Sequence, residues 1–173
     1  MSVRNRVRLR AMVTTDAEAI LKIYEEGIQT GHAPFEAEVS DLHKWDSRHL
    51  TQCRWLAKEE HTVLCWGALA QGSPGKVYLG VAEVSIYVSL NAQNQDIGSI
   101  LLERLISSSE ESSFWTLQAQ VFPENKISIY VHEKQGFRKS GTRRQLALMS
   151  YGSMAGEWRD PVLMERRSKI AGI

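Results

Sequence analysis

Two side chains in this sequence have the chemistry to move a proton near neutral pH, Glu83 and His132. Glu83 lies in an apolar run, VAEV at residues 81–84, and apolar surroundings raise the pKa of a carboxyl group toward the range of a useful general base. A histidine, with a reference pKa of about 6.5, can serve as either acid or base. The residue types alone also fit a plainer interpretation, in which Glu83 faces solvent and His132 is a surface or helix-cap residue.

A polar turn between a strand and a helix predicts an anion-binding site. Residues 83–88 alternate apolar and polar side chains like a half-buried strand, and apolar residues recur at helical spacing from Ile97 onward. The turn between them, residues 91–96, is rich in side-chain amides, and Gly98 and Ser99 follow in the first helical turn. The first N–H groups of a helix have no intrahelical partner and lie at the positive end of its dipole, so they favour an anion. By itself, however, the pattern is weak evidence, because most strand–turn–helix joints bind no ligand.

The rest of the chain predicts strands and helices in mixed order. Helices are expected over residues 15–27, with Thr15 and Glu18 as a capping box, over 40–50, with Ser40 as N-cap, over 97–109, and over 126–134, ended by Gly136. Strands are expected over residues 3–12, 53–58, 62–70, 77–88, 114–121, 138–148 and 158–165. Residues 107–113, SSSEESS, are expected to form a loop.

The composition is that of an ordinary globular protein and argues against several function classes. The chain has 173 residues and a net charge of +1, so we expect one domain over residues 1–173 and no nucleic-acid partner, which a basic surface would require. No apolar run reaches the roughly 18 residues of a membrane span, and no signal-peptide pattern follows the start, so no membrane partner is expected. Cys53 and Cys65 are too few to form a metal cluster and predict reduced thiols in a cytoplasmic protein.

Several short motifs, in order along the chain, resemble one enzyme superfamily. Residues 93–98, QNQDIG, resemble the Gln/Arg-x-x-Gly-x-Gly/Ala signature of the GNAT superfamily of acetyl-CoA-dependent N-acetyltransferases. Residues 114–141, which include HEKQGF at 132–137, are similar to the strand, helix and closing strand that follow in that superfamily. Residues 156–160, GEWRD, resemble the Gly-x-Trp-x-Asp of the subgroup that acetylates phosphinothricin and methionine sulfoximine. The resemblance covers roughly the whole chain.

The resemblance implies a fold and a co-substrate. The fold would be α/β of the GNAT type, with a single mixed, mostly antiparallel central sheet flanked by helices. The co-substrate would be acetyl-CoA, with no metal. By resemblance, the backbone N–H groups of Ile86, Tyr87 and Val88 bind the pantetheine arm and the reaction oxyanion. The pyrophosphate is expected at the turn formed by Asn94, Gln95, Asp96, Ile97, Gly98 and Ser99. Asn125 is expected to contact the CoA arm, although an asparagine here is also a good helix N-cap and could do both.

The same resemblance assigns the proton transfers and the acceptor. Glu83 stands where the subgroup has a base, often acting through water, and His132 stands where the family protonates the departing thiolate. The acceptor would be a small amine such as phosphinothricin, arsinothricin or methionine sulfoximine. Phe35, Lys76 and Trp158 are expected to line its pocket, with Lys76 on the acceptor carboxylate. The sequence leaves open whether Phe35 only packs its loop onto the core. The subgroup also implies a homodimer.

Asp96 departs from the resembled pattern because the signature has its first glycine there. A residue with a Cβ adopts a left-handed backbone less readily than glycine, and a carboxylate repels a pyrophosphate. The turn also carries Asn94 and Gln95 where relatives often have Arg or Lys. We therefore expect weakened acetyl-CoA affinity. The alternative is a GNAT-fold module that binds acyl-CoA poorly and has a binding or regulatory role without catalysis.

Overall fold

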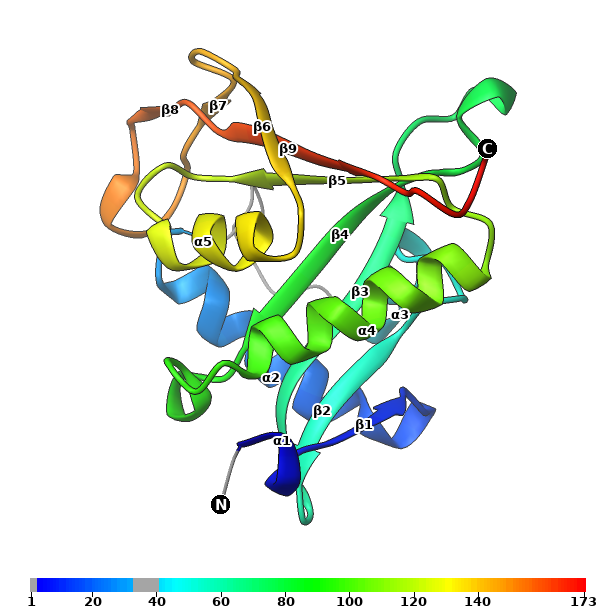
Figure 1. Cartoon of the computed structure of the whole chain (residues 1–173). Helices are drawn as coiled ribbons and strands as arrows, with labels where there is room; N and C mark the ends of the chain where they lie inside the picture. The colour runs from blue at the N-terminus through cyan, green and yellow to red at the C-terminus, as the bar shows by residue number, and fades with distance from the viewer. Residues whose placement is uncertain (1–2, 33–40) are drawn as a thin grey trace.

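The computed structural model describes residues 3–32 and 41–173, and a seven-stranded sheet forms its centre (Figure 1). The strands of this sheet are β1 (Arg8–Ala11), β2 (Trp55–Glu59), β3 (Thr62–Gln71), β4 (Val81–Val88), β5 (Thr116–Val121), β6 (Arg138–Thr142) and β9 (Val162–Arg167). Their spatial order is β1-β2-β3-β4-β5-β9-β6, and every neighbouring pair is antiparallel except β4 with β5. The predicted mixed, mostly antiparallel sheet is confirmed.

Helices cover both faces of the sheet, as Figure 1 shows. The helices are α1 (Val3–Arg6), α2 (Ala17–Gln29), α3 (Leu42–Arg48), α4 (Ile97–Glu111) and α5 (Lys126–Lys134). One core cluster joins apolar residues of α4 and α5 to Val84 of β4 and Leu117 of β5. A second cluster, on the opposite face, joins α2 and α3 to Trp66 of β3 and Tyr87 of β4. Because side chains alternate between the faces of a strand, Glu83 and Tyr87 lie on the α2 side, and Val84 lies on the α4 side.

The start of the chain differs from the predicted strand over residues 3–12. Val3–Arg6 form the single turn α1, and the pairing with β2 is limited to β1. The predicted capping box of Thr15 and Glu18 is wrong as well. Residues 14–16 form a 3-10 turn in which the Asp16 carboxylate accepts a hydrogen bond from the Val13 N–H at 2.8 Å and binds Arg10 at 2.7 Å. An aspartate with a cationic partner outcompetes a neutral hydroxyl for this position.

Three further helix or strand boundaries, those of α3, α4 and β4, differ from the predicted ones. The α3 N-cap is Asp41, whose carboxylate accepts from the Lys44 N–H at 2.9 Å, and Ser40 lies outside the described residues. Helix α4 continues through most of SSSEESS to Glu111, since the Ser109 hydroxyl donates to the Ile106 carbonyl at 2.7 Å and the Ser108 hydroxyl accepts from the Trp55 indole. Strand β4 begins at Val81, after a 3-10 turn at Lys76–Tyr78.

The predicted strand over residues 138–148 is divided between two sheets. Its first part is β6 in the central sheet, whereas β7 (Ala147–Leu148) pairs with β8 (Trp158–Arg159) in a separate two-stranded sheet. The predicted strand over residues 158–165 divides in the same way, into β8 and β9. The small sheet therefore projects beyond the end of β5, next to the end of α2 (Figure 1).

Both cysteines are buried, free thiols, and burial raises the pKa of the Cys65 thiol far above its ordinary range. Among the helices of residues 3–32 and 41–173, none is long and apolar enough to cross a membrane. The described residues contain no cluster of histidine, cysteine and carboxylate side chains that could hold a metal ion.

Candidate functional site

The parallel pair β4 and β5 separates after only three residue pairs. Val81, Ala82 and Glu83 are paired with residues 116–118 of β5, and beyond Glu83 the two strands diverge, as their ribbons show in Figure 1. On its other edge β4 stays paired with β3 up to Val88. Alternate N–H and C=O groups of residues 84–88 therefore point toward β5 without a ladder partner in the described part of the chain. Unused donors on an extended edge are suited to binding an amide-bearing chain or an oxyanion.

The N-terminus of α4 lies beside the end of this open edge. A Cβ on Gly98 would lie 3.3 Å from the Val88 side chain, so the glycine lets the first turn of α4 approach β4 closely. The N–H groups of Ile97, Gly98 and Ser99 donate to no other described residue, because the first intrahelical bond runs from the Ile100 N–H to the Asp96 carbonyl. These free donors and the helix dipole fit a phosphate group. The predicted anion site thus has backbone donors in place.

The turn before α4 has the backbone of a glycine-containing turn, although it contains no glycine. Asn94 and Asp96 both have positive φ, +59° and +60°. The Asp96 carboxylate makes no helix-cap hydrogen bond and instead contacts the Lys134 ammonium of α5 at 3.1 Å. The Ser99 hydroxyl is buried and accepts from the Gln135 amide at 3.1 Å, so it faces α5. Among the predicted phosphate-binding residues, Ser99 therefore offers its N–H and not its hydroxyl.

Glu83 is the last β4 residue paired with β5, at the point where the strands separate. Burial raises the pKa of the Glu83 carboxyl, while a hydrogen bond from Gln120 and the positive charge of Arg143 partly offset this rise. The Gln120 amide donates to Glu83 at 3.5 Å, and Arg143 donates to the Gln120 carbonyl oxygen at 3.4 Å. The direction expected from the apolar run around Glu83 is confirmed. A carboxylate with a raised pKa at an open strand edge can accept a proton from an ammonium group.

The Tyr87 side chain is buried, although it alternates along β4 with the polar residues Glu83 and Ser85. Its ring stacks on Trp66 at 4.7 Å between centroids and meets Tyr24 edge-on at 4.9 Å. Burial raises the pKa of the Tyr87 hydroxyl well above its usual value. The side chain is therefore part of the core under α2, and only its backbone remains available for the predicted cofactor role.

His132 is buried on α5, on the opposite face of the sheet from Glu83. Its Nδ1 lies 2.7 Å from the Ser128 carbonyl, which can only accept, so Nδ1 carries a proton. Its ring meets Phe137 edge-on at 5.0 Å. Burial lowers the pKa of His132, so the ring is neutral at pH 7 and Nε2 is an acceptor. The structure does not bring Glu83 and His132 into contact.

Asn125 caps α5, as one of its two interpretations predicted, because its side-chain oxygen accepts from the Ser128 N–H at 3.1 Å. Its predicted contact with CoA stays a prediction. Tyr130, on the same helix, is 63% exposed although its helical spacing is also typical of a core residue.

Two of the three residues predicted to line the acceptor pocket, Lys76 and Trp158, lie far apart in the chain's fold. Phe35 lies outside the described residues. Lys76 lies in the turn before β4, at the start of β5, whereas β8 with Trp158 lies beyond the other end of β5 (Figure 1). Strand β5 has six residues and so spans about 20 Å. A pocket containing both Lys76 and Trp158 is therefore not formed within one chain. The sequence could not show this, because the position of β8 depends on long-range contacts.

Arg159, next to Trp158, is a buried structural residue that the sequence did not reveal. Its guanidinium is only 2% exposed, donates to the Gly31 carbonyl at 3.0 Å and to Glu124 at 2.8 Å, and lies over the Phe122 ring at 3.9 Å. It therefore joins β8 to the end of α2 and to the residues after β5. Nothing in the motif GEWRD distinguishes this buried arginine from a surface one.

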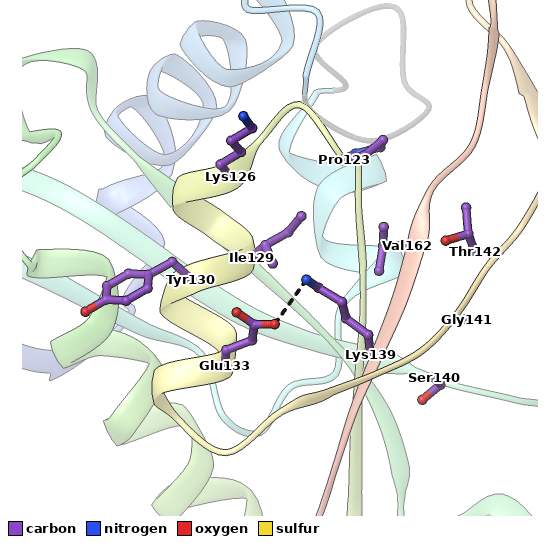
Figure 2. Close-up of a pocket in the computed structure, with 10 residues that line it drawn as sticks. All are labelled: Pro123, Lys126, Ile129, Tyr130, Glu133, Lys139, Ser140, Gly141, Thr142 and Val162. Carbon is purple, nitrogen blue, oxygen red and sulfur yellow. Dashed lines mark ion pairs between the residues drawn. The ribbon is translucent and has the colours of Figure 1, made fainter.

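A cavity of about 520 Å³ lies between α5 and β6, away from the predicted site (Figure 2). Its lining residues are Pro123, Lys126, Ile129, Tyr130, Glu133, Lys139, Ser140, Gly141, Thr142 and Val162. The Lys139 ammonium and the Glu133 carboxylate pair at 3.1 Å across it. No predicted catalytic or cofactor-binding residue lines this cavity. The open edge of β4 and the N-terminus of α4 are the better candidates, since they present unused donors.

Comparison with known proteins identifies the architecture around this open edge. Residues 18–137 match the model of the acetyltransferase (GNAT) family. A phosphinothricin N-acetyltransferase of Streptomyces viridochromogenes is 28% identical over 169 residues, covering 94% of this chain and 88% of that protein. Among solved structures, a ribosomal-protein-alanine N-acetyltransferase from Brucella melitensis is 27% identical with a TM-score of 0.81, over 93% of this chain and 99% of that chain.

A phosphinothricin acetyltransferase from Sinorhizobium meliloti, solved in complex with AcCoA, shares the fold at 24% identity. Its TM-score is 0.85, over 96% of this chain and 91% of that chain. The family match extends from α2, through the separated strands and the N-terminus of α4, to the end of α5. Because it spans well over half of the chain and includes the site built above, the chain belongs to the acetyltransferase (GNAT) family.

Proposed function

We propose that this chain transfers the acetyl group of acetyl-CoA to the amine of a small amino-acid-like acceptor of the phosphinothricin, arsinothricin or methionine sulfoximine type. The observation that carries the proposal is the position of Glu83, whose pKa is raised, at the point where β4 separates from β5. Acetyl transfer to an amine requires a base for the ammonium proton and donors for the oxyanion. The similarity to phosphinothricin acetyltransferases supports the acceptor class.

In this proposal, acetyl-CoA binds to the backbone N–H groups that have no partner within the described residues. In this proposal the N–H groups of Ile97, Gly98 and Ser99 hold the pyrophosphate, and the open edge of β4 pairs with the amide groups of the pantetheine arm. The close packing of Gly98 on Val88 makes these two sets of donors continuous. The thioester then lies along β4 in the direction of Glu83.

The proposed proton transfers use the half-buried Glu83 and the buried His132. Glu83 accepts a proton from the acceptor's ammonium group, directly or through water, and the free amine attacks the thioester carbonyl. Backbone N–H groups of β4 stabilise the oxyanion, after which the C–S bond breaks and the thiolate takes a proton. After the attack, the nitrogen of the tetrahedral intermediate is positively charged and must lose a second proton. Because Nε2 of neutral His132 carries no proton, we propose that His132 takes this second proton and passes it to the thiolate as the C–S bond breaks.

Steady-state kinetics of Glu83→Gln tests this proposal. The variant should lower kcat by about 10²- to 10⁴-fold and leave the KM for acetyl-CoA nearly unchanged, because only proton transfer is lost. Glu59→Gln is the matched control, since Glu59 is a strand glutamate on β2. Wild-type kcat in the Glu83 variant would refute the assigned base.

A second candidate function, an acyl-CoA-binding or regulatory module without catalysis, is favoured by Asp96 at the phosphate site. Equilibrium unfolding with and without acetyl-CoA distinguishes the two. Acetyl-CoA at 100 times its Kd should raise the free energy of unfolding by about 2.7 kcal/mol. Stabilisation without turnover on a panel of amines would favour the module, whereas no stabilisation at millimolar acetyl-CoA would contradict both.

A further inference from the structure

We propose that Arg143 binds the carboxylate of the acceptor, so that an α-amino acid is held with its ammonium group at Glu83 and its carboxylate at Arg143. This inference rests on the function proposed above and specifies its acceptor. It replaces Lys76, the cation predicted for this role from the sequence, which lies at the far end of β5 from the small sheet.

Three side chains from three elements form one polar row. Glu83 comes from β4, Gln120 from β5, and Arg143 directly follows β6. The Gln120 amide group stands between the other two, donating to Glu83 at 3.5 Å and accepting from Arg143 at 3.4 Å. Both distances exceed the optimum of about 2.9 Å, so the carboxylate and the guanidinium keep the capacity for shorter bonds to a ligand.

Arg143 has no carboxylate partner among the described residues, as is also true of Arg8, Arg144 and Arg167, but it alone of these four contacts the Gln120–Glu83 pair. Eight others form ion pairs, namely Arg4, Arg6, Arg10, Arg54, Arg104, Arg138, Arg159 and Arg166. Within residues 3–32 and 41–173, the Arg143 guanidinium donates to Gln120 alone, and the side chain is exposed. A guanidinium has five N–H donors in a planar fork that matches a carboxylate. Most donors of Arg143 therefore remain available.

The charges of the row are complementary to a zwitterion. The acid at Glu83 and the cation at Arg143 are separated by one amide group and two hydrogen bonds. A small α-amino acid presents its ammonium and carboxylate groups from a single carbon, and hydrogen bonds of about 2.8 Å at each end give it a similar reach. Arg143 is also the cation whose charge acts on Glu83, so a bound carboxylate would neutralise that influence and make Glu83 a stronger base.

Kinetics of Arg143→Gln with two matched acceptors tests the inference, one being methionine sulfoximine and the other its amine analogue without the carboxylate. For methionine sulfoximine the KM should rise about 10- to 100-fold with a small change in kcat, because a charged hydrogen-bonded contact is lost. The KM for the analogue should stay within about twofold of wild type. Arg143→Lys should recover part of the affinity, since it restores the charge but not the fork.

Arg144→Gln is the control, because Arg144 is the neighbouring exposed arginine. It should leave both KM values unchanged. Equal effects of Arg143→Gln on both acceptors, or equal effects of the Arg143 and Arg144 variants, would overturn the inference. A wild-type protein that acetylates the analogue and no amino acid would also overturn it while leaving the acetyl transfer itself standing. A wild-type protein that acetylates no amine would refute the proposed function instead.

Discussion

Asp96 combines two residue-scale features that oppose each other at the phosphate site. Its left-handed backbone, with φ of +60°, is one that glycine adopts most readily, and aspartate tolerates it better than most residues. Its carboxylate pairs with the Lys134 ammonium at 3.1 Å and so neutralises a cation beside the first turn of α4. The turn therefore keeps its backbone donors and lacks a free positive charge.

Asp96→Gly should lower the KM for acetyl-CoA by about fivefold, equivalent to about 1 kcal/mol. The change removes a repulsive carboxylate, relaxes the backbone and frees Lys134. Asp96→Asn is the control that removes the charge while keeping a residue that accepts positive φ. An unchanged or higher KM in Asp96→Gly would mean that the pair with Lys134 already shields the carboxylate from the phosphate.

The lowered pKa of His132 predicts how the free energy of unfolding depends on pH. Burial lowers its folded-state pKa below the unfolded value of about 6.5, so the unfolded chain binds more protons below that pH. Its contribution to stability is present above about pH 6.5 and is lost as the pH falls below it. The half-buried His49, whose pKa burial also lowers, acts in the same direction. Urea unfolding at pH 7.5 and pH 5.5 should therefore show a smaller pH-induced loss in His132→Asn than in wild type. An equal loss would show that His132 does not protonate on unfolding.

The environment of an individual residue could be predicted from the sequence where its neighbours along the chain determine that environment. The apolar run around Glu83 correctly predicted the direction of its pKa shift, and Asn125 caps the helix that follows it. Tyr87 was not predictable, because Trp66 and Tyr24, which bury it, come from other elements. Arg143 and Gln120 meet only after β5, β9 and β6 have paired.

At the scale of elements, Gly67 sets how closely α4 packs on β3. A Cβ at Gly67 would lie 2.5 Å from a methyl group of Leu105 and 3.3 Å from one of Leu101. Both leucines are fully buried, so they cannot move aside without disturbing the core. The close approach holds the helix whose N-terminus forms the phosphate site.

Gly67→Ala should lower the free energy of unfolding by about 1–3 kcal/mol through overpacking, as measured by urea denaturation. Gly141→Ala in β6 is the matched control, since a Cβ there meets nothing within 4 Å, and it should be nearly neutral. Adding Leu105→Ala to Gly67→Ala should cost less than the sum of the two single changes, because it removes the clashing methyl group. Strict additivity would exclude that clash as the cause.

Elements with local start and stop signals were predicted well. Helix α5 has the predicted bounds, because Asn125 caps it and Gly136 follows its last turn with φ of +86°. The division of residues 138–148 between two sheets was missed, since it depends on the pairing of β7 with β8, whose strands are ten residues apart in sequence. The extension of α4 through serine-rich residues was missed because partners such as Trp55 are distant in sequence.

At the scale of the whole molecule, the sheet consists of two parts joined at β4 and β5. Residues 84–88 of β4 have one edge paired with β3 and the other edge open. Amide hydrogen exchange should therefore distinguish the two edges, with faster exchange for the β4 amides that point toward β5. Acetyl-CoA should slow the exchange of those amides and leave the amides between β2 and β3 unchanged. Uniform exchange along β4, or a ligand effect confined to α2, would contradict the proposed binding edge.

The burial of Cys53 and Cys65 has a practical consequence for measuring turnover. A thiol reagent reacts with thiolate, and the buried Cys65 thiol, with its raised pKa, offers almost none at neutral pH. Cys53 is enclosed as well, with its sulfur 3.5 Å from the Ser112 hydroxyl. The folded protein should therefore not react with such a reagent. After denaturation, its two cysteines should release two equivalents of chromophore per chain. Each chromophore released during a reaction would then report one molecule of free CoA, because the thiols of the folded enzyme contribute no background signal.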